Sequence, residues 1–275
     1  MMADQLRERL GETAIVENRT GADGRLAVRA VASSEPDGRT LLITPFGPVA
    51  IHPSVYSNLS YDPFKDLAPV AQVATFDFAA VVGPMAPVNS LEELVAWAKA
   101  NPTQANFATP GAGTLPHFFG ITFANAAGIN LRHVPYRGTA PALTDLMGGQ
   151  IPILFTTTAD AVELHRAGRV KVLATSGAKR SPFTSDVPTF TEAGYGIQGE
   201  AWYGFFVRAG TPPEMVEKLN KALVEGVRSD AVRERLLKIG LVPTGTSPSE
   251  LGAIQKADFE RWAPVIKASG FKAQD

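Results

Sequence analysis

The 275-residue sequence contains no cysteine. Disulfide bonds, cysteine nucleophiles and thiolate metal sites are therefore excluded together. The sequence also has little excess charge of either sign, since 26 Lys and Arg residues stand against 27 Asp and Glu residues. A nucleic-acid-binding surface needs a strong basic excess, so we expect no nucleic-acid partner. An anionic ligand would have to be held by local dipoles or by single side chains.

Long apolar runs are absent as well, and no stretch of the sequence is long enough to cross a bilayer. Residues 1–10 predict an amphipathic helix that ends at Gly11 and not an apolar secretory leader. We therefore expect the leader of an exported protein to be missing from this sequence. Hydrophobic residues make up 45% of the chain, which is ordinary for a globular protein of one large or two medium domains.

The common signatures of enzyme sites are also missing. The four histidines are scattered without the spacing of metal ligands, and there is no Gly-x-Ser-x-Gly elbow. Whole predicted elements separate Asp77, Asp145 and Asp160, which therefore suggest no acid–base pair. Residues 194–199 match Gly-x-Gly-x-x-Gly, but an aromatic strand follows them where a dinucleotide site needs a helix. We predict a protein that is not an enzyme, with no catalytic residues, metal or cofactor.

Short apolar segments alternate with helical segments along most of the chain. This alternation predicts an α/β fold with mainly parallel sheets flanked by helices. Ser/Thr-x-x-Glu patterns at residues 90–93 and 211–214 predict helix starts with capping boxes, and residues 247–250 predict the start of the last helix. Pro264 predicts that the last helix kinks or ends there. Strands are expected at residues 14–17, 40–43, 70–82 (two strands), 105–108, 131–134, 151–155, 170–174 and 202–207.

The most informative segment is Ala108–His117, which reads as the end of a strand, a glycine-rich turn and the start of a helix. Two glycines let the backbone approach a ligand closely, and free N–H groups at a helix start favour an anion. The hydroxyls of Thr109 and Thr114 would add hydrogen-bond donors. We interpret this turn as a carboxylate site, with an ordinary strand-to-helix turn as the alternative. It is not a phosphate P-loop, because no Gly-Lys-Ser/Thr follows.

Two further small-residue turns, at residues 44–47 and 156–158, are expected at the same ends of their strands, where ligands of α/β sheets bind. Three of these residues also have a purely structural interpretation. His117 could cap or pack locally, Phe46 could fill the floor of the cleft, and Trp202 could belong to the core. Arg137 could neutralise a carboxylate, but a solvated side chain is the simpler interpretation. The candidate ligand-binding residues are Thr44, Phe46, Thr109, Gly111, Ala112, Gly113, Thr114, His117, Thr156, Thr157 and Trp202.

With these motifs in order, the chain resembles a known family, the solute receptors of tripartite tricarboxylate transporters, also called Bug or TctC-type receptors. Each matching motif is weak alone, and their order and spacing over nearly the whole chain are specific. The matching stretches are residues 16–24, 36–42, 61–69, 108–117, 133–138, 141–146, 176–181, 186–189, 202–204 and 210–212.

The resemblance implies a two-lobed, type II periplasmic-binding fold. Residues 1–82 with 205–275 would form the N-terminal lobe and residues 83–204 the second lobe, joined by strands near residues 81–82 and 203–207. It also implies a periplasmic receptor that holds a small carboxylate in its cleft, on the backbone N–H groups of residues 109–114. Membrane permease subunits would be its partners. A receptor that signals to a membrane sensor kinase is the alternative.

Two departures from the family pattern carry expectations of their own. Family members begin with a leader, a strand and a glycine-rich turn that supplies half of the carboxylate site, whereas this sequence begins inside the next helix. We therefore expect the N-terminal lobe to lack its usual first strand. Many members also carry an Asp where this chain has Thr156. Because Thr cannot pair with an amine by charge, we expect a dicarboxylate or aromatic acid instead of an amino acid.

Overall fold

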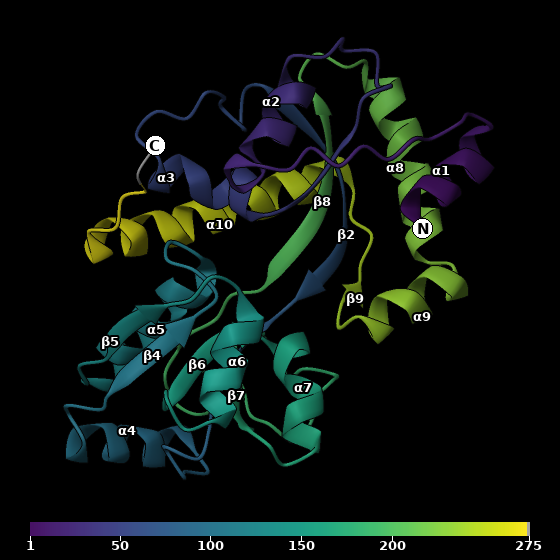
Figure 1. Ribbon diagram of the computed structural model, residues 1–275. Coiled ribbons are helices and arrows are strands. Elements are labelled where there is room, and N and C mark those ends of the chain that lie inside the picture. Colours follow the sequence, from purple (N-terminus) through teal and green to yellow (C-terminus); the bar gives the residue numbers. More distant parts are fainter. Residues whose placement is uncertain (274–275) are drawn as a thin grey trace. The chain divides into compact units, whose positions relative to one another are not determined.

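The computed structural model describes residues 1–273, which divide into two compact units (Figure 1). Unit 1 contains Met1–Thr75 and the chain from Ala201 onward, and unit 2 contains Phe76–Glu200. The expected boundaries after residue 82 and before residue 205 are therefore displaced. The reason is strand pairing: β3 (Phe78–Val82) pairs only within unit 2, whereas β8 (Ala201–Arg208) pairs within unit 1.

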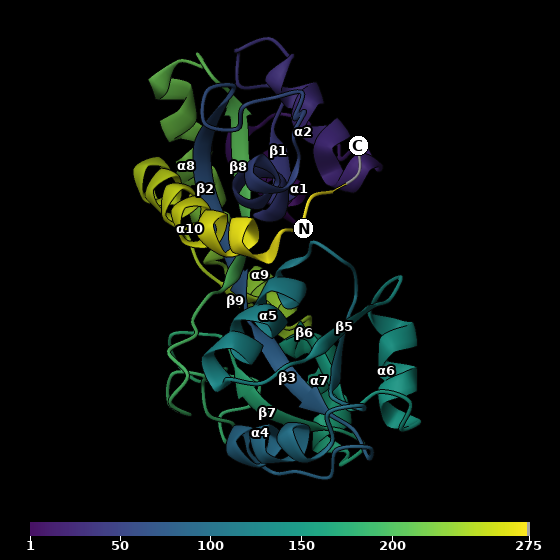
Figure 2. The same ribbon diagram turned by 90° about the vertical axis from the view of Figure 1, so that its left-hand side faces the viewer.

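Unit 1 is a four-stranded sheet in the order β1-β8-β2-β9, and Figure 2 shows β1, β8 and β2 side by side. Its core packs side chains of β2 and β8, including Val73 and Phe205, against Leu219 and Leu223 of the helix α8. The elements are α1 (Met2–Leu10), η1 (Ala22–Gly24), α2 (Arg25–Ala32), β1 (Leu42–Pro45), the π-helical turn η2 (Gly47–Ile51), α3 (His52–Val55), β2 (Leu67–Phe76), β8, α8 (Pro213–Val227), α9 (Asp230–Lys238), β9 (Val242–Pro243) and α10 (Pro248–Ser269).

Unit 2 is a five-stranded sheet in the order β5-β4-β6-β3-β7 with helices on both faces. The strands β4, β5 and β6 are parallel, while β3 runs against both β6 and β7. The elements after β3 are α4 (Leu91–Ala100), β4 (Asn106–Thr109), α5 (Leu115–Ala127), β5 (Arg132–Pro135), α6 (Thr139–Met147), β6 (Ile153–Thr157), α7 (Thr158–Arg166) and β7 (Lys171–Thr175).

The pairing pattern of unit 2 brings the ends of four strands to one border of the sheet. Because β4, β5, β6 and β7 run in the same direction, their last residues Thr109, Pro135, Thr157 and Thr175 share this border, which we call the carboxyl edge. The helices α5, α6 and α7 begin shortly after three of these strands. Their N-termini therefore lie along the carboxyl edge.

Alternation along the strands of unit 2 creates two different cores. Small and branched side chains such as Ala108, Leu154 and Val81 pack under α6 and α7. The opposite face is aromatic, with buried rings that include Phe107, Phe119 and Phe155 near α5. Gly120 of α5 makes this close packing possible, since a Cβ at Gly120 would lie 2.2 Å from the Phe107 ring.

Several expectations about individual elements are wrong. Residues 14–17 form no strand; Ile15 and Val16 are 87% and 68% exposed, because no strand of the described chain pairs with this segment. Parallel pairing joins β4 to β5 and β4 to β6. The partners β1 and β8 are antiparallel, as are β2 and β9. Parallel pairing of consecutive strands needs a crossover connection, which is usually a helix. No single strand–helix–strand crossover joins β1 to β8, so these two strands are free to pair antiparallel.

The predictions of helix starts and ends are confirmed only in part. The last helix, α10, begins where it was expected, with a capping box formed by Ser247 and Glu250, but it continues past Pro264 to Ser269. Ser90 caps α4, whereas the Glu93 carboxylate accepts from the N–H of Asn89 and so does not complete a box. At α8 the hydroxyl of Thr211 donates to the Arg208 carbonyl, and no side chain caps that helix.

We predict that Gly120→Ala destabilises the protein by about 1–3 kcal/mol, because the added methyl group overpacks against Phe107. Gly252→Ala in α10 is the matched control, since its Cβ would make an ordinary 3.4 Å contact with Pro69. That change should be neutral or slightly stabilising, because Ala favours a helix over Gly. Urea unfolding of both variants measures the difference, and equal effects would contradict the packing argument.

Candidate functional site

The segment with the strongest sequence signal lies on the carboxyl edge, as its strand–turn–helix pattern predicts. Thr109 ends β4, residues 110–114 form a loop, and α5 begins at Leu115. Gly113 has a φ of 74°, in the left-handed region where glycine is favoured. Thr114 stands at the N-cap position of α5, but no side-chain hydrogen bond caps this helix.

The loop is braced from inside by its two threonines. The hydroxyl of Thr109 donates to the carbonyl oxygen of Gly111 over 3.0 Å, and the hydroxyl of Thr114 donates to the same oxygen over 2.7 Å. In this structure neither hydroxyl proton is therefore available to a ligand. Their protons instead satisfy the Gly111 carbonyl, an acceptor that would otherwise repel an anion at this loop.

Unlike the Gly111 carbonyl, most backbone N–H groups of the loop are not satisfied within the described residues. Within residues 1–273, the N–H groups of Gly111, Ala112 and Thr114 have no hydrogen-bond partner, and Ala112 and Thr114 are exposed. Unpaired N–H groups at the start of a helix of 13 residues carry a positive partial charge. Such groups are suited to a carboxylate, so this observation favours the anion-site interpretation over an ordinary turn.

Two histidines, His117 and His133, contact this loop and hold it through hydrogen bonds. The N–H of Gly113 donates to His117 Nδ1 over 3.2 Å, and the ring of His117 stacks on that of His133 with 3.9 Å between centroids. His133 Nε2 lies 2.7 Å from Thr109 Oγ1. Since the Thr109 hydroxyl donates to Gly111, we infer that His133 donates from Nε2. His117 therefore accepts a hydrogen bond from the loop, which agrees with its interpretation as a local cap.

Burial sets the charge state of this histidine pair. Loss of solvation lowers the pKa of His117, and the pKa of His133 falls to about 4 through the same loss together with repulsion from His117. Both rings are therefore neutral at pH 7. A neutral imidazole can accept from Gly113 at one nitrogen, which a protonated one cannot do at Nδ1.

Next to the loop, the start of α6 is fastened to it by backbone bonds. The N–H of Tyr136 donates to the Thr109 carbonyl over 2.9 Å, and the N–H of Gly138 donates to the Pro110 carbonyl over 2.8 Å. Between them, Arg137 is exposed and makes no ion pair with any residue in the described chain. The carboxyl edge thus holds one guanidinium beside the loop.

The third turn contains a residue that the sequence interpretation did not select. Thr156 and Thr157 do not offer their hydroxyls outward, because both donate to Asp160 Oδ2, over 2.8 and 2.7 Å. Asp160 lies in the first turn of α7 and is exposed. The sequence interpretation names Asp160 only among carboxylates that are too far apart in the chain to suggest an acid–base pair. Its spacing of three and four residues after two threonines at a helix start was the signal that could have identified it.

The remaining candidates, Thr44, Phe46 and Trp202, belong to unit 1 and gather where β1 ends beside the start of β8. The N–H of Phe46 donates to the Trp202 carbonyl, and their rings lie 6.1 Å apart. Trp202 is 1% exposed and donates its indole N–H to Asp258 over 2.8 Å. The hydroxyl of Thr44 donates to the Pro45 carbonyl. Trp202 thus packs in the core of unit 1, as its structural alternative proposed.

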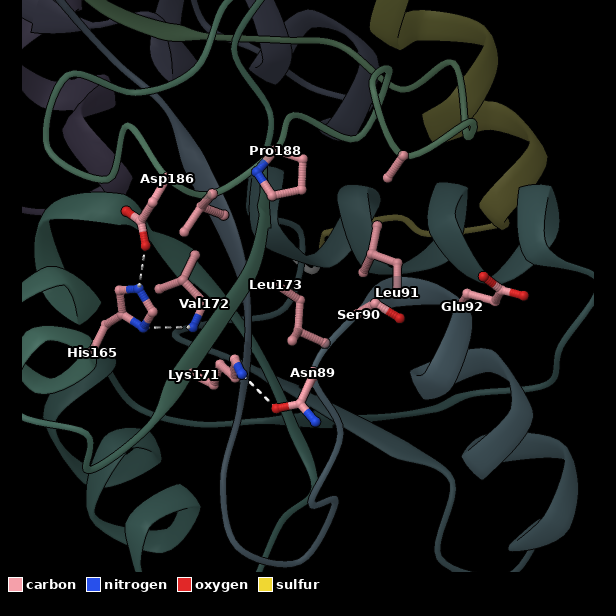
Figure 3. Close-up of a pocket in the computed structure, with 12 residues that line it drawn as sticks. Asn89, Ser90, Leu91, Glu92, His165, Lys171, Val172, Leu173, Asp186 and Pro188 are labelled. Carbon is pink, nitrogen blue, oxygen red and sulfur yellow. Dashed lines mark hydrogen bonds and ion pairs between the residues drawn. The ribbon is translucent and has the colours of Figure 1, made fainter.

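A separate pocket of about 290 Å³ lies at the opposite border of the unit 2 sheet, where β7 begins (Figure 3). His165 faces Asp186 across it at 4.0 Å, and the amine of Lys171 is bonded to Asn89. None of the candidate residues lines this pocket. These polar groups already have protein partners, so the carboxyl edge is the better candidate site.

No group of three or more His, Asp or Glu side chains suited to a metal ion occurs among residues 1–273. Among the same residues, no helix has the length and apolar character needed to cross a membrane.

The fold is that of a periplasmic binding protein of the TctC type. The family described as tripartite tricarboxylate transporter family receptor matches residues 1–271, so the chain belongs to this family. It is 36% identical to a UPF0065 protein of Bordetella bronchiseptica, over 99% of this chain and 81% of that protein. It is 31% identical to protein BugT of Bordetella pertussis, over 99% and 84% of the two chains.

Solved structures of similar proteins agree with this assignment. The structure of R. palustris Rpa4515 with adipate superposes with a TM-score of 0.84 at 32% identity, covering 98% of this chain and 91% of that one. MatC from Rhodopseudomonas palustris with bound malate gives 0.79 at 30% identity, covering 96% and 92%. The periplasmic binding protein BugD gives 0.81 at 32% identity, covering 99% and 92%.

The lowered histidine pKa values predict that acid weakens unit 2. A histidine whose pKa falls on folding contributes stability above its unfolded pKa of about 6.5 and loses that contribution as the pH drops to the folded value. For His133, with a folded pKa of about 4, the loss is at most about 3 kcal/mol.

The comparison of wild type with His133→Gln isolates this effect from other groups, such as His52, whose pKa is also lowered by burial to about 4. Gln keeps a donor for Thr109 and does not titrate. The stability advantage of the wild type should therefore shrink between about pH 6.5 and pH 4 in urea unfolding. An advantage that stays constant over this range would contradict the buried, neutral state of His133.

Proposed function

We propose that this chain is an extracytoplasmic receptor that captures a small organic carboxylate and delivers it to the permease subunits of a tripartite tricarboxylate-type transporter. Membership of the receptor family supports the class of function. The observation that carries the ligand assignment is the set of unpaired N–H groups on Gly111, Ala112 and Thr114. These groups would bind the negative end of the acid, and the periplasm is the compartment in which such a receptor works.

The expected ligand is a dicarboxylate or an aromatic acid in preference to an amino acid. The N-termini of α5, α6 and α7 all lie at the carboxyl edge, and their positive dipole ends disfavour an ammonium group there. Thr156 itself is uncharged, and its hydroxyl donates to the Asp160 carboxylate. Similar proteins have been solved with malate and with adipate, which are both dicarboxylates without an amine.

A charge placed in the loop tests the site. Ala112→Asp should lower carboxylate affinity at least about tenfold, because the new carboxylate repels the ligand and competes for the same N–H groups. Ala126→Asp is the matched control, since Ala126 is an exposed alanine near the other end of α5. Isothermal titration calorimetry with a panel of dicarboxylates and aromatic acids measures both variants. Equal affinity of the two variants would show that the ligand binds elsewhere.

The ligand class has its own test in a titration with amino acids. Aspartate and glutamate should bind far more weakly than the best dicarboxylate or aromatic acid of the panel. Submicromolar binding of either amino acid would overturn the amine-free assignment. Uptake of the bound acid by cells that contain the permease, and its loss when the receptor is deleted, would test delivery to the transporter.

A further inference from the structure

Asp160 is held at the carboxyl edge by an unusual concentration of donors on one oxygen atom. The hydroxyls of Thr156, Thr157 and Thr139 all donate to Asp160 Oδ2, over 2.8, 2.7 and 3.3 Å. These hydroxyls come from the end of β6, the cap of α7 and the first residue of α6. Two hydroxyls from β6 and one from α6 thus fix the position of the carboxylate, whereas an exposed Asp side chain is ordinarily free to move.

The second oxygen of the same carboxylate is left for an outside partner. Asp160 Oδ1 accepts no hydrogen bond and forms no ion pair within residues 1–273, and the side chain is exposed. An ionised carboxylate has room for several donors, and hydrogen bonds to charged groups are stronger than neutral ones. Asp160 therefore presents a positioned, strong acceptor to whatever binds at this edge.

This acceptor lies beside the proposed carboxylate site. Thr139, which donates to Asp160, directly follows Gly138, whose N–H donates to the Pro110 carbonyl at the start of the loop. One continuous set of bonds thus runs from Asp160 through the start of α6 to the loop. The carboxyl edge combines unpaired N–H groups, which suit an anion, with one fixed acceptor, which suits a donor.

The donor that fits is a hydroxyl group. A ligand ammonium next to Asp160 would also face the positive N-terminal ends of α5, α6 and α7. A hydroxyl gives the hydrogen bond without that repulsion. A second carboxylate pointed at Asp160 would in turn be repelled by it.

We propose that Asp160 is a specificity-determining residue that accepts a hydrogen bond from a ligand hydroxyl, so that the receptor prefers hydroxylated carboxylic acids. This inference rests on the proposed function, because it places the ligand carboxylate on the loop at residues 111–114. It adds the group by which the receptor distinguishes one small acid from another.

Three probes with the same four-carbon dicarboxylate frame test it: succinate, L-malate and L-aspartate, which carry hydrogen, hydroxyl and ammonium at C2. The wild type should bind malate about tenfold more tightly than succinate, and aspartate more weakly than malate. Asp160→Asn should bring the malate-to-succinate affinity ratio close to one. Asn keeps an oxygen for the three threonine hydroxyls, so the variant should fold normally.

The ratio between two ligands on one variant is independent of a purely structural loss, which would weaken both equally. Glu163→Gln is the matched control, because it removes a charge from an exposed residue of α7 that pairs only with Arg166 within the described chain. Its ratio should match that of the wild type. An unchanged ratio in Asp160→Asn, or tighter binding of aspartate than of malate, would overturn the inference. Binding of none of the panel acids would instead overturn the proposed function and the inference with it.

Discussion

The site depends on how one loop uses its own polar groups. The hydroxyls of Thr109 and Thr114 converge on the carbonyl oxygen of Gly111, while the N–H groups of Gly111, Ala112 and Thr114 keep no partner within the described residues. A peptide loop normally presents donors and acceptors together, so a ligand meets both signs. Here the Gly111 carbonyl is satisfied internally, and the N–H groups of Gly111, Ala112 and Thr114 remain available to a ligand. An anion at these N–H groups therefore does not meet an unsatisfied Gly111 carbonyl.

The arrangement of the loop is maintained by residues behind it, which hold it whether or not they contact a ligand. The stacked pair of His117 and His133 holds the loop through Gly113 and Thr109, and the aromatic core behind it fixes the rings. Burial keeps both rings neutral, and neutrality is what allows His117 to accept from the backbone. The polar loop thus draws its rigidity from the hydrophobic face of the sheet, as preorganised sites generally do.

The direction of the strands decides where this chemistry can occur. In unit 2 the parallel strands end on one border, and the starts of three helices follow them. The opposite border has a pocket too, yet its His165 and Lys171 are already paired with Asp186 and Asn89. Concavity alone therefore does not identify a site, whereas unpaired N–H groups and aligned dipoles favour the carboxyl edge as the candidate site.

The sequence by itself determined the class of fold, the Ala108–His117 turn as a strand-to-helix connection, and the family to which the chain belongs. These follow from local spacing, glycine positions and short motifs, which are written in consecutive residues. Tertiary structure alone decided that the Thr109 and Thr114 hydroxyls point inward, that residues 14–17 remain unpaired, and that Asp160 joins the edge. Such outcomes depend on which distant groups compete for each donor and acceptor, and that competition exists only once the elements have packed.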